Sequence, residues 1–341
     1  MALTRLYKFV KPLVSRNKFL KALVIGYGQT FRLLPKVLTV ALTYRCPCHC
    51  VHCGISDYRR QGDEELSTQE VKTLIDDSRR VRSIVQVTFT GGEPMVCADI
   101  YDLVAYSKSK GFFTKIDSNA VFLDAEKLKR LKAAGIDRVG ISLDHYQADA
   151  HDHLRDYKGL FDRIIAAVRI CEELGISCYL QTYATRQRME EGGLEKILEL
   201  AKGLRVDKTK VQTPALIGTM RHRDEAALKH EDFEALARIL APYPSAYVES
   251  EVFSPLDYRK FCRLNFISNV HITAYGDVLP CCWMPLSFGN VRERRLPAIL
   301  RDMYRDKMFK KLLSSEGCLC SDKEFLKTHI GDSADLPVRV R

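Results

Sequence analysis

Four cysteines within eight residues constrain this chain of 341 residues more than any other feature. They lie in the segment Cys46–Cys53, directly after the strand-like run Val37–Leu42. Three of them, Cys46, Cys50 and Cys53, have the spacing C-x3-C-x2-C. Thiolates spaced this closely suit a metal ion or an iron–sulfur cluster, because one loop can wrap three sulfurs around one face of a cubane. Three ligands would leave one iron of a [4Fe–4S] cube without a protein ligand, and open coordination sites are where metalloenzymes act on substrates.

The cysteine content also bears on the compartment. Twelve cysteines in a chain without a credible cleavable signal peptide argue for a reducing compartment, and we expect the cytoplasm. A disulfide framework therefore fits poorly. The alternative is a structural zinc knuckle built from the same loop cysteines with His49 or His52. No apolar run approaches the roughly 20 residues that span a bilayer, so no transmembrane helix is expected.

Strand-like and helix-like segments alternate about six times after the loop. The expected strands after the first are residues 84–90, 112–116, 138–143, 177–183 and 208–213, and the expected helices are 67–80, 99–110, 124–134, 160–174 and 194–204. The first helix opens with the capping box Ser67–Glu70. This alternation predicts an α/β fold with a parallel sheet and right-handed crossovers. Six units fall short of a closed eight-fold barrel.

Polar and glycine-rich motifs directly follow these strands, where parallel α/β folds place their chemistry. Gly91–Pro94 reads Gly-Gly-Glu-Pro and comes after the second strand. Ser118–Ala120 comes after the third and Ser142–Asp144 after the fourth. Gln181, Tyr183 and Arg186 lie at the end of the fifth, on the side of the expected substrate cavity.

The cysteine loop and the Gly-Gly-Glu-Pro motif together make the chain resemble the radical S-adenosylmethionine (SAM) superfamily. The resemblance implies a partial (β/α)6 TIM-like barrel with a [4Fe–4S] cluster on Cys46, Cys50 and Cys53. In that superfamily SAM chelates the open iron, and one electron cleaves it into methionine and a 5′-deoxyadenosyl radical that abstracts hydrogen from the substrate. An electron donor of the flavodoxin or ferredoxin type is implied as well.

The same resemblance implies a set of SAM-binding residues. The expected residues are Gly91, Gly92, Glu93, Pro94, Ser118, Asn119, Ser142 and Asp144. Ala120 stands where relatives often have glycine, which puts the local backbone shape in question. Ser142-Leu143-Asp144 with His151-Asp152 and Arg155 resembles an S-L-D…H-D-x-x-R run of members with an extra cluster domain. Asp144 as a helix cap and His151 as a surface histidine are the alternatives.

Cysteines return near the C-terminus. Cys262, Gly276 and Cys281 read C-x13-G-x4-C around a predicted β-hairpin at residues 269–280, and a helix is expected at 296–313. The pattern resembles the SPASM and Twitch domains, which hold auxiliary iron–sulfur clusters. The expected ligands of one auxiliary [4Fe–4S] cluster are Cys262, Cys281, Cys318 and Cys320, with Cys282 or His329 as a replacement for one of the last pair.

The remaining cysteines receive plainer interpretations. Cys171 and Cys178 are expected to be small buried hydrophobic residues. Cys48 and Cys97 are left unassigned, and a structural role is favoured for Cys48.

Residues 1–36 carry eight Lys and Arg and no Asp or Glu, out of a net charge of +10 for the chain. Their apolar residues recur at helical spacing, so the segment is expected either to lie on an anionic membrane surface or to pack on the enzyme as a flap. Nucleic-acid binding is not expected, since no recognition motif accompanies the charge. The predicted division is 1–36 N-terminal segment, 37–245 barrel, 246–330 auxiliary-cluster domain and 331–341 tail.

The sequence leaves the substrate open among three classes. The basic N-terminus favours a lipid or other hydrophobic, membrane-associated molecule. A peptide, as in ribosomal-peptide maturation or sulfatase activation, and a sugar or cyclitol are the alternatives. An auxiliary cluster that accepts an electron would favour net oxidation or bond formation. A non-catalytic iron–sulfur carrier is the alternative from another class of protein.

Overall fold

The computed structural model describes residues 36–60, 62–248, 268–315, 317–331 and 336–340. The N-terminal segment 1–35 and the predicted ligand Cys262 lie outside these ranges. The strands are β1 (Val37–Ala41), β2 (Gln86–Thr90), β3 (Phe113–Ser118), β4 (Arg138–Ser142), β5 (Ser177–Tyr183), β6 (Lys208–Gln212), β7 (Ala246–Val248), β8 (Asn269–Ile272), β9 (Val278–Leu279), β10 (Leu286–Ser287) and β11 (Val338–Arg339).

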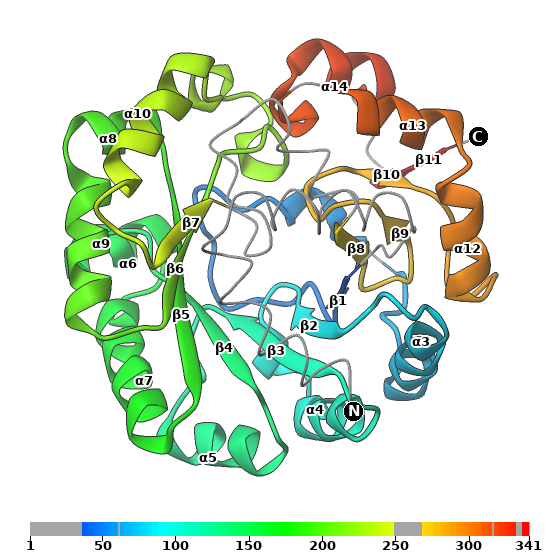
Figure 1. Cartoon of the computed structure of the whole chain (residues 1–341), viewed down its shortest axis with the longest axis horizontal. Helices are drawn as coiled ribbons and strands as arrows, with labels where there is room; N and C mark the ends of the chain where they lie inside the picture. Colours follow the sequence, from blue (N-terminus) through cyan, green and yellow to red (C-terminus); the bar gives the residue numbers. More distant parts are fainter. Residues whose placement is uncertain (1–35, 61, 249–267, 316, 332–335, 341) are drawn as a thin grey trace, which may run out of the picture.

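Helices form an outer ring around the strands (Figure 1). They are α3 (Thr68–Arg80), α4 (Ile100–Ser109), α5 (Ala125–Ala133), α6 (Ala148–Arg155), α7 (Leu160–Leu174), α8 (Arg186–Glu190), α9 (Gly193–Gly203), α10 (His230–Leu240), α12 (Leu296–Met303), α13 (Lys307–Ser314) and α14 (Lys323–His329). Short 3-10 turns lie between them: η1 (Ser56–Tyr58), η2 (Pro94–Val96), η3 (Gly218–Met220), η4 (Asp224–Ala226) and η6 (Leu319–Ser321).

Nine of the described strands build a curved sheet in the order β7-β6-β5-β4-β3-β2-β1-β8-β9. Neighbours from β7 to β8 are parallel, and only β9 runs antiparallel to β8. The predicted partial (β/α)6 barrel is confirmed. The hairpin predicted at residues 269–280 is also present as β8 and β9, but β8 pairs with β1 and so extends the barrel sheet. A second sheet joins β10 to β11 of the predicted tail.

The two faces of the sheet differ in chemistry, because successive side chains of a strand point to opposite sides. On one face Val40 pairs with Phe89, and both are fully buried. This apolar face packs against the outer helices in a large core, and a smaller separate cluster lies where β6 meets α8, α9 and α10. On the other face Thr88 pairs with Lys115, and Gln181 pairs with Lys210. The face turned toward the inside of the barrel is therefore polar.

Local sequence signals explain most element boundaries. Ser67 and Glu70 form the predicted reciprocal capping box of α3, and Asp124 caps α5. One prediction is wrong, because the helix expected over 296–313 is two helices. The side chain of Asp306 accepts hydrogen bonds from Met308 N and Phe309 N, so a new helix starts there.

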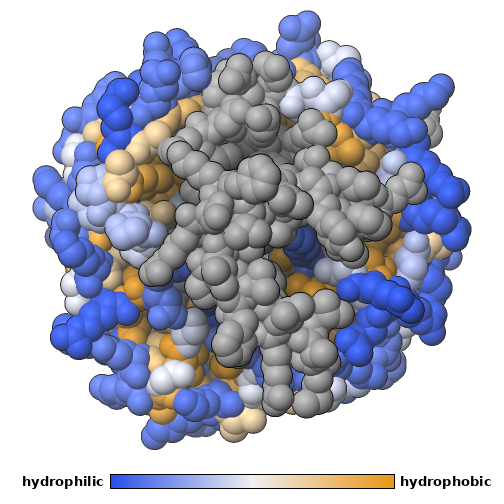
Figure 2. Space-filling model, in the orientation of Figure 1, coloured by the Kyte–Doolittle hydropathy of each residue, from blue (hydrophilic) through white to orange (hydrophobic). Residues whose placement is uncertain are grey.

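The outer surface seen in Figure 2 is mainly hydrophilic around its rim. Among the described residues, Val85 is the one exposed large hydrophobic residue. No helix in the described ranges is both long and apolar enough to cross a membrane.

Candidate functional site

The cysteine loop lies at the carboxyl end of β1 and is held from two sides. The C-terminal end of α6 accepts two backbone hydrogen bonds, from His49 N to Arg155 O at 3.2 Å and from Val51 N to Leu154 O at 3.0 Å. On the other side, Thr219 N of η3 donates to Cys53 O at 3.0 Å. The three predicted ligands Cys46, Cys50 and Cys53 are half-buried. The loop is thus fixed by the elements that follow β4 and β6.

The thiols of this loop influence one another. Hydrogen bonding by the Cys48 thiol lowers the pKa of Cys46 to about 7 and the pKa of Cys50 to about 5. Burial raises the pKa of Cys53. No group of three or more His, Cys, Asp or Glu side chains in the described ranges already stands as a metal site. The donor chemistry nevertheless fits a cluster, since three thiols share one loop and two of them readily become thiolates.

The Gly-Gly-Glu-Pro segment follows β2 and packs directly on the backbone that leads into the cysteine loop. Gly92 N donates to Thr43 O at 2.7 Å and Glu93 N donates to Arg45 O at 3.0 Å. A Cβ atom on Gly91 or Gly92 would lie well inside 3.0 Å of the backbone of residues 43–45. The two glycines are therefore required by the approach of these two loops, in addition to the approach of SAM expected from sequence.

Glu93 joins the ends of β2 and β3. Its carboxylate is completely buried, and it accepts hydrogen bonds from Ser118 Oγ at 2.9 Å, Asn119 N at 2.7 Å and Met95 N at 3.0 Å. Burial raises the pKa of Glu93 to about 7. Each oxygen of the carboxyl group thus has a protein partner, which gives Glu93 an architectural task in the loop.

The loop after β3 contacts the cysteines. Asn119 Nδ2 lies 3.4 Å from the sulfurs of Cys46 and Cys48. Ala120 adopts a left-handed backbone conformation with φ of 68°. The alanine found where relatives often have glycine therefore keeps a glycine-like backbone shape, at a cost of about 1 kcal/mol.

A buried charge cluster follows β4. Arg155 donates to Asp144 Oδ2 at 2.5 Å, and its Nη1 lies 3.7 Å from the sulfur of Cys50. His52 Nε2 lies 3.3 Å from Asp144 Oδ2. Burial raises the pKa of Asp144, but the charges of Arg155 and His52 outweigh it and hold that pKa well below its ordinary value.

The structure excludes the two alternative roles, Asp144 as a helix cap and His151 as a surface histidine. Asp144 caps none of the described helices, because the N-cap residue of α6 is Gln147 and the side chain of Asp144 is engaged by Arg155. His151 is fully buried, and its Nδ1 accepts from Asp144 N at 3.1 Å. Ser142 ends β4 and pairs with Gln181 of β5.

The C-terminal cysteines face the same end of the barrel. Cys281 and Cys320 are buried, whereas Cys282 and Cys318 are half-buried. Leu216 N, after β6, donates to Cys320 O at 2.7 Å. The indole of Trp283 covers Gly54, where a Cβ would lie well inside 3.0 Å of the ring. His329, the alternative ligand, lies 3.0 Å from Lys311 Nζ.

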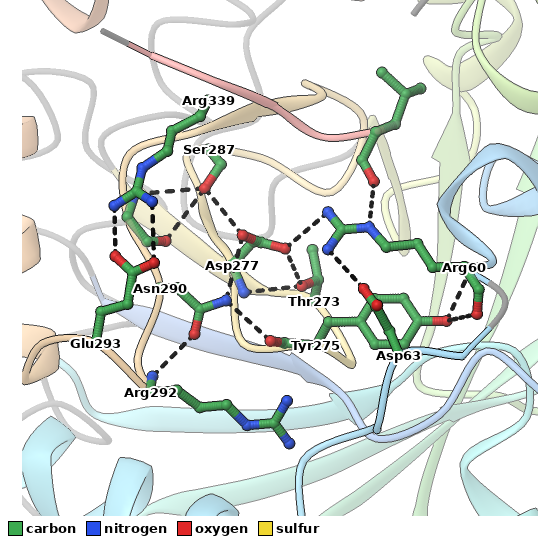
Figure 3. A network of polar contacts seen from close by, with 12 residues as sticks. Arg60, Asp63, Thr273, Tyr275, Asp277, Ser287, Asn290, Arg292, Glu293 and Arg339 are labelled. Carbon is green, nitrogen blue, oxygen red and sulfur yellow. Dashed lines mark hydrogen bonds and ion pairs between the residues drawn. The ribbon is translucent and has the colours of Figure 1, made fainter. Parts of the chain in front are cut away.

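A polar network ties the segment after the cysteine loop to the hairpin (Figure 3). Arg60 N donates to the hydroxyl of Tyr275 at 3.0 Å, and Arg60 Nη2 donates to Asp277 Oδ2 at 3.1 Å. Asn290 Nδ2 donates to Tyr275 O at 3.0 Å. Both cysteine regions are therefore anchored to one framework.

Comparison with known proteins identifies the family. The family model described as the radical SAM superfamily matches residues 40–201, and the family model described as the SPASM iron–sulfur cluster-binding domain matches residues 262–322. The chain belongs to the radical SAM superfamily and carries a C-terminal SPASM domain. It is an enzyme whose cofactors are a [4Fe–4S] cluster, SAM and an auxiliary iron–sulfur cluster, as predicted.

Relatives cover most of the chain. An AdoMet-dependent heme synthase of Methanosarcina barkeri is 25% identical over 83% of this chain and 86% of its own length. A PqqA peptide cyclase of Rhizobium meliloti is 28% identical over 80% of this chain and 76% of its own length. The structure of Streptococcus suis SuiB bound to the precursor peptide SuiA has a TM-score of 0.65 at 16% identity, covering 88% of this chain and 76% of that one. The last similarity concerns the fold.

Contacts between residues far apart in the chain could not be predicted from the sequence. No sequence pattern assigns a role to Cys48, yet its thiol interacts with Cys46 and Cys50. The contact of Arg155 with Cys50 joins residues 105 positions apart, which no local pattern reveals. Cys171 and Cys178 are buried as predicted.

Proposed function

We propose that this enzyme oxidises a polar substrate, a peptide, by hydrogen abstraction from an unactivated C–H bond, with net oxidation or bond formation assisted by the auxiliary cluster. The observation that carries the proposal is the polar inner face of the barrel. Strand after strand turns hydroxyl, amide and ammonium groups inward, as in the pairs Thr88 with Lys115 and Gln181 with Lys210. Such a lining suits a substrate with hydrogen-bonding and charged groups, because polar groups placed on a cavity wall can bind matching groups of a ligand and fix its orientation.

A charged cluster on this face shows the chemistry available there. Lys115 Nζ donates to the hydroxyl of Tyr179 at 2.7 Å and lies 3.4 Å from Asp117 Oδ2. The hydroxyl of Tyr179 also bonds to Asp117. These contacts pass over Gly140 of β4, where a Cβ would collide with both Asp117 and Tyr179.

The site residues have the following proposed roles. When bound, the cluster and SAM supply a radical that abstracts hydrogen. The radical-generating cluster is held by Cys46, Cys50 and Cys53. The SAM site is shaped by Gly91, Gly92, Glu93, Pro94, Ser118, Asn119, Ser142 and Asp144. The auxiliary cluster is held by Cys262, Cys281, Cys318 and Cys320. Asn119 Nδ2 and Arg155 Nη1 stabilise negative charge on Cys46 and Cys50. We also propose an electron donor of the flavodoxin or ferredoxin type.

Among the relatives, the PqqA peptide cyclase supports a peptide substrate. A lipid substrate, reached from the basic residues 1–36, stays a prediction, because residues 1–35 of that segment lie outside the described ranges. Peripheral contact with a membrane stays a prediction for the same reason. The sugar or cyclitol alternative shares the need for a polar cavity and has no further support.

A deuterium-transfer experiment tests the substrate class. Anaerobically reconstituted enzyme receives SAM, a reductant and either the peptide fraction or the lipid fraction of source cells grown in D2O. Mass spectrometry then follows deuterium in 5′-deoxyadenosine, because abstraction carries the substrate's hydrogen to that product. We expect deuterium with the peptide fraction. Deuterium from the lipid fraction alone would contradict the proposal.

A further inference from the structure

The hydroxyl of Tyr58 is buried without a partner. Tyr58 ends η1, five residues after Cys53, and its side chain is 2% exposed. Its oxygen has no hydrogen-bond partner in the described part of the chain. A buried polar group without a partner costs about 1–3 kcal/mol and calls for an explanation such as a missing ligand.

The surroundings of this hydroxyl identify the missing group. Burial raises the pKa of Tyr58 well above its ordinary value, and the nearby thiols of Cys320, Cys282 and Cys281 raise that pKa further. Two of these cysteines, Cys281 and Cys320, belong to the proposed ligand set of the auxiliary cluster. The packing agrees: Trp283, next to Cys282, lies against Gly54, and Leu216, two residues before the Gly218 that bonds Asp57, donates to Cys320 O at 2.7 Å. Tyr58 is therefore packed between the chain segments that carry the cysteines of the SPASM domain.

The position of Tyr58 is fixed from both sides. Tyr44 stacks on its ring with 6.0 Å between ring centroids. The neighbouring Asp57 accepts from Gly218 N at 3.1 Å and pairs with Arg221 at 3.0 Å. Trp283 of the SPASM domain packs on Gly54, four residues upstream. A side chain held this firmly cannot turn its hydroxyl to water without moving the loop.

We propose that Tyr58 donates a hydrogen bond to a sulfur of the auxiliary cluster, so that the barrel's own cysteine loop supplies a positioning residue to the SPASM domain. The inference rests on the proposed function, because it needs the auxiliary cluster near Cys281 and Cys320. Hydrogen bonds to cluster sulfurs stabilise the added electron and so raise the reduction potential. The loop that carries the radical cluster would thereby tune the second cluster.

A matched pair of variants tests this role. Tyr58→Phe removes the hydroxyl, and Tyr304→Phe removes another buried tyrosine hydroxyl that lacks a partner among the described residues. Tyr304 follows α12 and packs edge-on against Phe309 of α13, with 5.0 Å between ring centroids, and burial raises the pKa of Tyr304. Both variants are made in full-length protein whose Cys46, Cys50 and Cys53 are replaced by Ala, which leaves the auxiliary cluster as the species titrated by EPR.

The expected result is a more negative midpoint potential for Tyr58→Phe and an unchanged potential for Tyr304→Phe. Tyr58→His, which restores a donor, should recover part of the shift. Without iron, Tyr58→Phe should unfold at the same or a higher temperature than its parent, because it deletes an unsatisfied hydroxyl. A purely structural tyrosine would instead lose stability in the iron-free protein and leave the potential in place.

Three outcomes would overturn the inference. An unchanged potential in Tyr58→Phe refutes the hydrogen bond while leaving the auxiliary cluster intact. A parent protein without auxiliary iron refutes the proposed ligand set, and the inference with it. If the Tyr58→Phe cluster is too labile to titrate, the rate of iron loss decides: faster loss than from Tyr304→Phe supports the inference, and equal loss overturns it.

Discussion

Arg155 lies between Cys50 and a buried carboxylate: its Nη1 is 3.7 Å from the Cys50 sulfur, while its Nε donates to Asp144 at 2.5 Å. The guanidinium links α6 to the cysteine loop and neutralises Asp144, which is only 1% exposed. A single buried charge without a partner is far less stable than the pair.

Replacing Arg155 by Met should therefore lower the free energy of unfolding of the iron-free protein by about 3–5 kcal/mol, because the buried Asp144 would lose its guanidinium partner and keep only the contact with His52. The double variant Arg155→Met with Asp144→Asn should regain much of that loss. Urea unfolding of the parent protein, the single variant and the double variant measures the loss of stability and its recovery. Equal losses in the single and double variants would show that the ion pair is not the cause.

Gly140 should resist enlargement. An added Cβ would lie well inside 3.0 Å of Asp117 and Tyr179, so Gly140→Ala should destabilise the protein by about 1–3 kcal/mol through overpacking. Gly203 of α9 serves as the control, because a Cβ added there would meet no atom within 4 Å. Gly203→Ala should be neutral or stabilising by up to about 1 kcal/mol. Thermal unfolding compares the stabilities of Gly140→Ala and Gly203→Ala. Similar changes in stability at both positions would refute the crowding at Gly140.

Ala120 offers the opposite change. Its φ of 68° favours glycine, so Ala120→Gly should stabilise the protein by about 1 kcal/mol. Chemical unfolding of the iron-free protein checks the sign. Ala120 is 1% exposed, so its methyl group is packed in the protein interior. A loss of stability in Ala120→Gly would mean that the packing of this methyl group contributes more free energy than the backbone strain costs.

Local signals in the sequence predicted much of the barrel. The bounds predicted for α7 and β5 match the structure, because an amphipathic helix ending at Gly175 and a β-rich run leave little choice. The short, polar helix α6 and the three-residue β7 have no comparable pattern and were missed. The motifs of the site were found because their residue types and spacing identify the chemistry.

Long-range partners could not be predicted in the same way. Nothing local indicates that β8 pairs with β1, or that Tyr58 is buried in the same core cluster as Cys281 and Cys320, more than 200 positions away. Such contacts depend on how the chain closes in three dimensions. The assignments of individual cluster ligands and SAM contacts stay predictions, and Cys262 lies outside the described residues.

His271 predicts a pH dependence of stability. It is buried in β8, its Nδ1 has no partner among the described residues, and burial lowers the pKa of His271 to about 4. The unfolded chain binds this proton near pH 6.5, so stability is complete above that pH and is lost as pH falls toward 4. The loss from this group is about 3 kcal/mol. In His271→Phe the fall between pH 6.5 and 4 should be shallower, and an unchanged profile would contradict the assignment.

The central claim is that one chain holds a radical-generating cluster and an auxiliary cluster on separate cysteines. Its most direct test is anaerobic reconstitution of the full-length protein and of a Cys281→Ala/Cys320→Ala double variant, with iron and sulfide counted and 5′-deoxyadenosine assayed. We predict about eight irons falling to about four, as two cubanes require, with SAM cleavage retained in the variant. About four irons in both proteins would contradict the account, because the C-terminal cysteines would then hold no cluster.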